Sequence, residues 1–230
     1  MALTRPPVII ALALIFFLLA AVVFIYRDDN WSMAAVLLAA AVLFAFYLHF
    51  ELTHVTSKEL ALIATLAAVA ALGRVPFAAI PGIQPTTFLV ILSGCVFGSR
   101  VGFMVGSTAA LVSNFFLGQG PWTPWQMLAW GLAGASAGIL TGIRPNLGRW
   151  ELALFSGVWG YIFGWIMNLW TWTAFVYPLT WRSFFMTYLA SLGMDTLHAI
   201  GNIVFSLVFG KECWSILQRF RRKLHVTYLE

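Results

Sequence analysis

The sequence predicts an all-α, polytopic integral membrane protein. Its 230 residues are 61% hydrophobic and only 9% charged, whereas soluble domains are about 45–50% apolar and about 25% charged. So few charges cannot cover a water-soluble surface, which excludes a soluble enzyme, a disordered chain and a secreted disulfide scaffold. Since one crossing takes about 20 apolar residues, the chain has room for roughly six to eight spans.

The first two apolar runs form a pair. The run 7–26 is too long for the central region of a signal peptide, so we expect a retained span. A short polar turn leads to the second span, 31–50, and the polar stretch 51–59 follows it. We therefore predict an additional N-terminal transmembrane helix pair within residues 1–57.

Six further apolar segments follow. We expect them at 60–73, 86–98, 101–117, 126–143, 152–176 and 183–209, which together predict a six-helix unit over residues 58–211. A loop interrupted by proline connects the first two of these segments at 74–85, and a loop dense in tryptophan and proline lies at 118–125. The basic tail, 212–230, fits either an amphipathic helix on an anionic leaflet or the basic flank of a last span.

The basic residues predict the orientation. With eight spans and a cytoplasmic N-terminus, ten of the 13 Lys and Arg residues fall inside, and only Arg27, Arg74 and Arg182 fall outside. Cytoplasmic loops carry such an excess of positive charge. We expect both termini in the cytoplasm, whereas six or seven spans would spoil this partition.

Glycines four residues apart recur in three segments. The series are Gly94/Gly98/Gly102/Gly106, Gly134/Gly138/Gly142 and Gly160/Gly164. In lipid, small residues at this spacing allow helices to approach closely, so we interpret all three series as helix packing.

The last apolar segment has three polar residues on one helical face. Asp195, His198 and Asn202 follow the spacing i, i+3 and i+7, which places them together on a helix. Polar residues inside a membrane are costly and suggest function. Asp195 and His198 either contact a ligand or brace the helix. Too few further ligands converge for a metal site, since His49, His54 and His225 map elsewhere.

Amides and tryptophans gather towards the predicted outer side. They include Arg74, Gln84, Asn114, Gln119, Trp122, Trp125, Gln126, Trp130, Asn168, Trp170 and Trp172. An interfacial aromatic belt explains many tryptophans, but not Trp130, which lies well inside its helix. We therefore favour an aromatic-lined small-molecule pocket, whose indole rings suit a flat heterocyclic ligand.

One enzymatic alternative is an intramembrane serine protease. Gly134-Ala135-Ser136-Ala137-Gly138 matches G-x-S-x-G, and His198 would be the base. That motif needs a strand-to-helix turn, whereas here it lies inside a helix of small residues. The chain also has no P-loop motif, so ATP-driven work would require a partner.

The stretch from Lys58 to Lys211 resembles the substrate-binding S component of energy-coupling factor (ECF) vitamin transporters. The resemblance lies in Lys58–Ala64, Gly73-Arg74, Gln84–Thr87, the first glycine series, Asn114, Gly118–Met127 running into Trp130-Gly131, and Asp195-x-x-His198-Ala199-x-Gly201-Asn202. The stretch Gly118–Met127 is similar to that of members associated with vitamin B12.

This resemblance implies a six-helix S-component bundle, to which the N-terminal pair is an addition. It implies a loop, 74–85, that closes over the substrate, and an Ala64/Ala68 contact with a transmembrane coupling subunit. Two ATPase subunits would supply energy, and the component would reorient in the membrane to deliver its ligand. The chain itself would be no enzyme and would need no cofactor or metal.

The expected location is the plasma membrane of a prokaryote, and the expected solute is a cobalamin precursor such as α-ribazole or dimethylbenzimidazole. Cobalamin itself or another vitamin is the alternative. In this hypothesis Trp122, Trp125 and Trp130 enclose the ring system. Gln84, Asn114, Gln119 and Gln126 bind the polar edges, and Asp195 with His198 either contacts the ligand or braces the last helix. Arg74 and Asn168 are further expected substrate-binding residues.

Overall fold

The computed structural model describes residues 6–28, 30–52 and 55–224, with the backbone alone for 6–12, 26–28 and 224. All regular structure in these ranges is helical. The helices are α1 (Pro6–Asp28), α2 (Trp31–Glu51), α3 (Ser57–Arg74), α4 (Thr86–Phe97), α5 (Ser99–Leu117), α6 (Thr123–Ile143), α7 (Arg149–Phe175) and α8 (Trp181–Leu224). Arg5, His54, His225 and the side chain of Arg27 lie outside the described residues.

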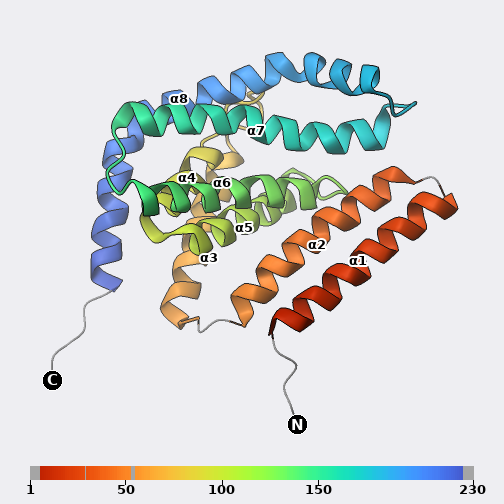
Figure 1. The fold of residues 1–230 in the computed structure, drawn as a ribbon. Helices are drawn as coiled ribbons and strands as arrows, with labels where there is room; N and C mark the ends of the chain where they lie inside the picture. Colours follow the sequence, from red (N-terminus) through yellow and green to blue (C-terminus); the bar gives the residue numbers. More distant parts are fainter. Residues whose placement is uncertain (1–5, 29, 53–54, 225–230) are drawn as a thin grey trace, which may run out of the picture.

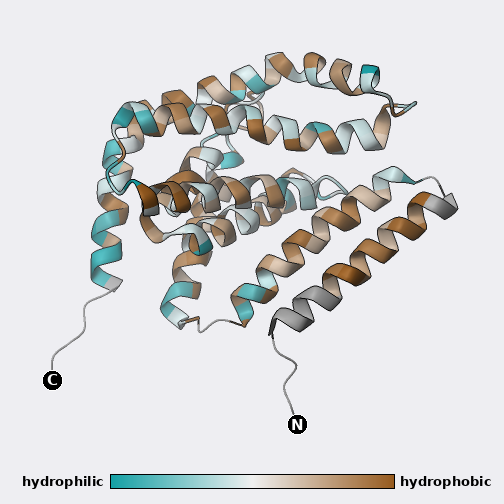
Figure 2. Cartoon of the chain, in the orientation of Figure 1, coloured by the Kyte–Doolittle hydropathy of each residue, from teal (hydrophilic) through white to brown (hydrophobic). Residues whose placement is uncertain are grey.

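The prediction of an all-α membrane protein is confirmed. Within the described ranges α2, α5, α6, α7 and α8 are long and apolar enough to cross a membrane, while α4 and the described part of α1 are shorter apolar helices. Figure 2 shows that hydrophilic residues concentrate at the start of α3 and in the last turns of α8. Apolar side chains therefore cover the middle of the molecule.

One predicted boundary was wrong. The expected loop 118–125 ends early because α6 already begins at Thr123, with Pro124 in its first turn. Proline is favoured there because the first amide groups of a helix have no partner within the helix. As a result, Trp125 is a helical residue whose direction is set by α6.

The last helix continues through the predicted boundary between residues 211 and 212. α8 has 44 residues, and Figure 1 shows it bending sharply before its C-terminal end. Beyond the bend, Trp214 and Leu217 pack against the main core, whereas Phe220 is exposed. The apolar side chains of the basic tail are thus divided between packing against the core and exposure.

The glycine series bring α4, α5 and α6 into backbone contact, as predicted, except at Gly98 and Gly142, where an added Cβ would meet open space. A Cβ placed on Gly94 or Gly102 would lie less than 2.5 Å from the carbonyl oxygen of Gly134. A Cβ on Gly138 would equally meet the backbone at Ser99. Only glycine fits at these crossings, so the series account for the tight centre of the bundle.

The N-terminal pair packs on one side of this centre (Figure 1). On α2, Phe46 stacks on Phe103 of α5 with ring centroids 3.9 Å apart. The hydroxyl of Tyr47 lies 3.0 Å from Ser107 Oγ, also on α5. Near its other end α2 contributes Ala39 to a small cluster with tryptophans of α6 and α7. The hairpin is therefore attached to the core at two levels.

Candidate functional site

A cavity of about 240 Å³ lies where the end of α3 and the loop 75–85 meet α6, α7 and α8. Seven of the predicted site residues line it: Arg74, Gln84, Gln126, Trp130, Asn168, Asp195 and His198. They come from four helices and one loop, so the fold assembles them from distant parts of the sequence. This juxtaposition makes the cavity the candidate site.

Arg74, the last residue of α3, is the centre of a buried hydrogen-bond network. Its Nη1 donates to Ser113 Oγ at 2.7 Å and to Asn114 Oδ1 at 2.6 Å. Its Nε donates to Gln84 Oε1 at 3.2 Å. The Asn114 amide in turn donates to Gln126 Oε1 at 2.8 Å. The planar guanidinium thereby fixes side chains of α5 and of the loop before α4, and through Asn114 also one of α6.

The aromatic side of the cavity contains a second chain of hydrogen bonds. Trp130 Nε1 donates to Thr87 Oγ1 at 2.8 Å, and Thr87 Oγ1 lies 2.9 Å from His198 Nε2. Phe163 packs against both rings, with centroids 4.7 Å from Trp130 and 5.0 Å from His198. The hydrogen bond and the ring contacts together fix the orientation of the His198 imidazole at the cavity.

The opposite side is a short polar chain between α7 and α8. Asn168 Nδ2 donates to Ser191 Oγ at 2.6 Å, and Ser191 Oγ donates to Asp195 Oδ2 at 2.9 Å. Gly164 leaves the space for this carboxyl, since a Cβ there would overlap Asp195 Oδ1. Among the described residues neither Arg74 nor Asp195 forms an ion pair, so both charged groups are available to a polar ligand.

The loop 75–85 covers the cavity. Gly82 has a φ of +72°, which favours glycine, and a Cβ there would lie 3.0 Å from the Met194 carbonyl oxygen and 3.1 Å from the His198 nitrogen. The loop therefore rests directly on the backbone of α8. Phe77 adds an edge-to-face contact with Phe205, whose ring centroid is 5.6 Å away.

The remaining predicted site residues do not line the cavity. Trp122 and Trp125 pack with Ala39 and Trp170, towards α2 and α7. Asn114 is buried behind Arg74, and Gln119 Nε2 donates to the Leu111 carbonyl at 2.9 Å. Their observed contacts are structural. Trp130 itself is only 2% exposed, and the Arg74 guanidinium lies 4.9 Å from its ring centroid.

Sequence reasoning missed several cavity residues. They are Gly82, Phe163, Gly164, Met167, Ser191 and Met194. Helical spacing could have found some of them, because Gly164 precedes Asn168 by four residues and Ser191 precedes Asp195 by four. The two methionines carried no such signal, since methionine is common in any apolar helix.

The two residues of the protease alternative lie in different places. Ser136 lines a groove near α2, and its hydroxyl donates to the Ala133 carbonyl at 3.1 Å. His198 lines the cavity and bonds to Thr87. The structure thus does not assemble the nucleophile and base that this alternative requires.

The comparisons with known proteins decide the family. A family model described as the substrate-specific component of ECF transporters matches residues 58–221. The chain belongs to this family. The match includes the whole cavity, whereas α1 and α2 lie outside it.

Curated relatives share part of the chain. The UPF0397 protein of Aliivibrio fischeri (strain MJ11) is 30% identical over 125 residues, which cover 47% of this chain and 68% of the relative. The UPF0397 protein of Aliivibrio salmonicida (strain LFI1238) is 30% identical over 109 residues, which cover 44% of this chain and 57% of the relative. No solved structure shows a significant match.

Family membership makes this chain a transport component. ECF substrate-specific components reside in the prokaryotic plasma membrane and work with a transmembrane subunit, ATPase subunits and a small-molecule substrate. The family match itself does not name that substrate.

Proposed function

We propose that the cavity beneath the loop 75–85 binds the solute that the transporter imports. We further propose that the solute is a vitamin B12-related precursor such as α-ribazole or dimethylbenzimidazole. The observation that carries this proposal is the cavity itself, in which Arg74 and Asp195, neither of which forms an ion pair with a described residue, share a small space with aromatic and methionine side chains. The sequence resemblance of Gly118–Met127 supports the vitamin class.

The cavity volume favours the precursor over cobalamin. Pockets that enclose drug-sized ligands have volumes of roughly 300–1,000 Å³, and this cavity has about 240 Å³. Of the two precursors, the bare benzimidazole, which is smaller than a drug-sized ligand, suits this volume better than its nucleoside. An intact corrinoid is much larger than a drug-sized molecule and would require the loop and helices to separate.

The side chains suit a flat heterocycle with polar edges. Phe163, Met167 and Met194 provide apolar walls, and methionine sulfur makes favourable contacts with aromatic rings. Asp195 accepts hydrogen bonds from ring N–H or hydroxyl groups, while Arg74 donates to oxygen or nitrogen acceptors. In this proposal Trp130 positions Arg74 and Phe163 and does not itself stack on the ligand.

The coupling face is proposed on α3, with both termini in the cytoplasm. Ala64 and Ala68 are exposed on the surface of this helix. Small residues four apart permit the close approach of another helix. Since α2 packs mainly on α1, α6 and α7, the N-terminal pair leaves this face accessible to a transmembrane coupling subunit.

Direct binding measurements test the substrate proposal. The purified chain is titrated calorimetrically with α-ribazole, dimethylbenzimidazole, cobalamin, thiamin, biotin and riboflavin. Binding of the two precursors, with loss in Met167→Trp and retention in Leu154→Trp, is the expected result. Leu154 is 69% exposed on the same helix and does not line the cavity. Binding of thiamin, biotin or riboflavin alone would refute the proposed substrate and leave the family assignment intact.

A further inference from the structure

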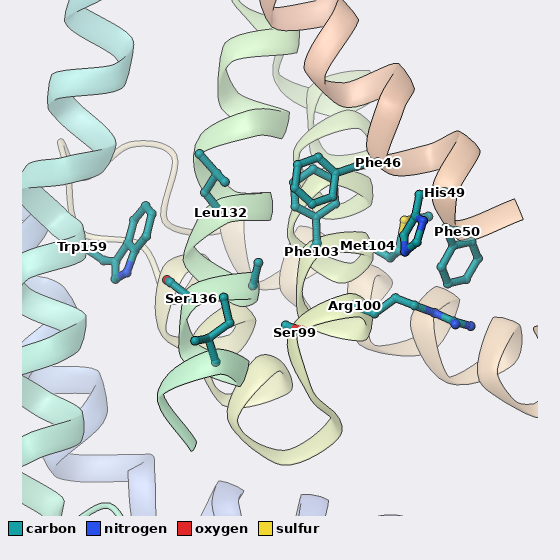
Figure 3. Close-up of a pocket in the computed structure, with 12 residues that line it drawn as sticks. Phe46, His49, Phe50, Ser99, Arg100, Phe103, Met104, Leu132, Ser136 and Trp159 are labelled. Atoms are coloured by element: carbon teal, nitrogen blue, oxygen red, sulfur yellow. The ribbon is translucent and has the colours of Figure 1, made fainter. Parts of the chain in front are cut away.

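A second hollow lies between the N-terminal pair and the core. This α2–α7 groove has a volume of about 450 Å³ and is bounded by Phe46 and Phe50 of α2, Phe103 of α5, Leu132 and Ile139 of α6, and Trp159 of α7 (Figure 3). α2 approaches α7 near Ala39 and Trp170 and diverges from it towards its own C-terminus (Figure 1). The groove occupies the resulting gap.

The groove lies among helices that can span a membrane. Its four walls are all helices that are long and apolar enough to span a membrane, and away from one end its lining is mainly apolar. Water has no hydrogen-bond partners there, and an empty groove would leave its lining without dispersion contacts on one side. A flexible hydrocarbon chain from the surrounding bilayer satisfies this surface.

One end of the groove is polar. Arg100 and Ser99, at the start of α5, lie there with His49, near the end of α2 (Figure 3). Arg100 Nη2 pairs with Glu59 at 3.0 Å, and its guanidinium lies 4.9 Å from the Phe50 ring centroid. Its buried Nε has no hydrogen-bond partner among the described residues.

The surroundings of Arg100 are basic. A neighbouring hollow at the starts of α3 and α5 is lined by Lys58 and Arg221 as well as Glu59. Arginine N–H groups match the geometry of phosphate oxygens, and basic pockets between transmembrane helices bind anionic lipid head groups. The excess of cations favours a head group with net negative charge over a zwitterionic one.

We propose that the α2–α7 groove is a binding site for one anionic phospholipid. An acyl chain lies along Phe103, Ile139 and Trp159, and the phosphate accepts a hydrogen bond from Arg100. The lipid bridges the N-terminal pair, which lies outside the family match, and the substrate-binding core, which lies inside it. This site is separate from the substrate cavity and does not depend on the identity of the solute.

Lipid competition and mass measurement test this site. The delipidated full chain is incubated with equal amounts of phosphatidylglycerol and phosphatidylcholine, and native mass spectrometry counts the lipids retained. We expect one phosphatidylglycerol per chain, retained at least several-fold over phosphatidylcholine. We also expect an excess of inorganic phosphate to displace little of it, because the acyl chain contributes to binding. Equal retention of both lipids, no retention, or a mass corresponding to two copies of the chain would overturn the proposal.

Matched variants locate the bound lipid. Ile139→Trp fills the groove without changing the Arg100–Glu59 pair, whereas Arg100→Gln removes the hydrogen-bond donor to the phosphate. Each variant should lower the retention of phosphatidylglycerol at least fivefold. Leu154→Trp adds the same bulk on a surface outside the groove and should retain lipid as the unmodified chain does. Cross-linking with a phosphatidylglycerol carrying a photoreactive chain should label α2 and α6, and labelling unchanged by Ile139→Trp would contradict the groove assignment.

Discussion

Arg74 allows the sharpest test of the substrate cavity, because lysine can replace its charge but not its shape. The guanidinium makes three side-chain hydrogen bonds, to Gln84, Ser113 and Asn114. A lysine ammonium at the same position can reach Ser113 and Asn114 but cannot also provide the planar Nε contact with Gln84. Arg74→Lys therefore releases Gln84, which belongs to both the loop and the cavity wall.

The expected loss of binding free energy equals the contribution of one hydrogen bond from a charged group. Such bonds contribute about 1.5–3 kcal/mol, and about 1.4 kcal/mol corresponds to a tenfold change in affinity. If the loop must be ordered for binding, Arg74→Lys should weaken dimethylbenzimidazole binding by about 10- to 100-fold. Arg74→Gln, which removes the cation and all three charged bonds, should weaken it further.

Scanning fluorimetry first gives the unfolding temperature of each variant. Calorimetry in lipid nanodiscs, below these temperatures, then measures the affinity of each variant for dimethylbenzimidazole. Arg182→Gln is the control, because Arg182 is exposed and does not line the cavity. Unchanged affinity in Arg74→Lys would refute the argument from guanidinium geometry. A lower unfolding temperature with unchanged affinity in Arg74→Gln would show that Arg74 only stabilises the fold.

Three further outcomes are expected. Gly164→Ala should abolish solute binding because its Cβ overlaps Asp195 Oδ1, whereas Gly193→Ala, with open space around its Cβ, should bind normally in the same titration. Ser206→Ala should raise the unfolding temperature, because Ser206 Oγ is buried without a hydrogen-bond partner among the described residues. Such a group costs about 1–3 kcal/mol of stability. A lower unfolding temperature would contradict this reasoning and indicate a water that bonds to the hydroxyl. Ala68→Trp should prevent co-purification with the coupling subunit while preserving solute binding, and Leu154→Trp should affect neither; a stable complex with Ala68→Trp would place the coupling face elsewhere.

The helices could be predicted because their signals are local. Apolar runs long enough for a span are interrupted by turn residues, and the glycine series mark the crossings of α4, α5 and α6. The polar face of α8 was visible as the spacing of Asp195 and His198, and both residues line the cavity. Because a helix has a fixed period, spacing along one helix is enough to place such residues on a common face.

The tryptophans show where local signals fail. Trp122 and Trp125 lie close in sequence to Gln126 and Trp130, yet they face the cluster around Ala39 and not the cavity. Their direction depends on where α6 begins and on the position of α2, which is far away in sequence. Neither can be deduced from composition, and the same holds for Met194, whose place in the cavity depends on how α8 packs against α7 and the loop 75–85.

The continuity of α8 has a mechanical consequence. Asp195 and His198 lie at the cavity, and Gln218 and Arg221 of the same helix lie beneath the α4–α5 turn and beside the start of α3. His198 and Arg221 are 23 positions apart in one continuous helix, which bends sharply between them (Figure 1). A displacement of α8 at the cavity therefore reaches the start of α3 through one continuous helical backbone that changes direction at this bend.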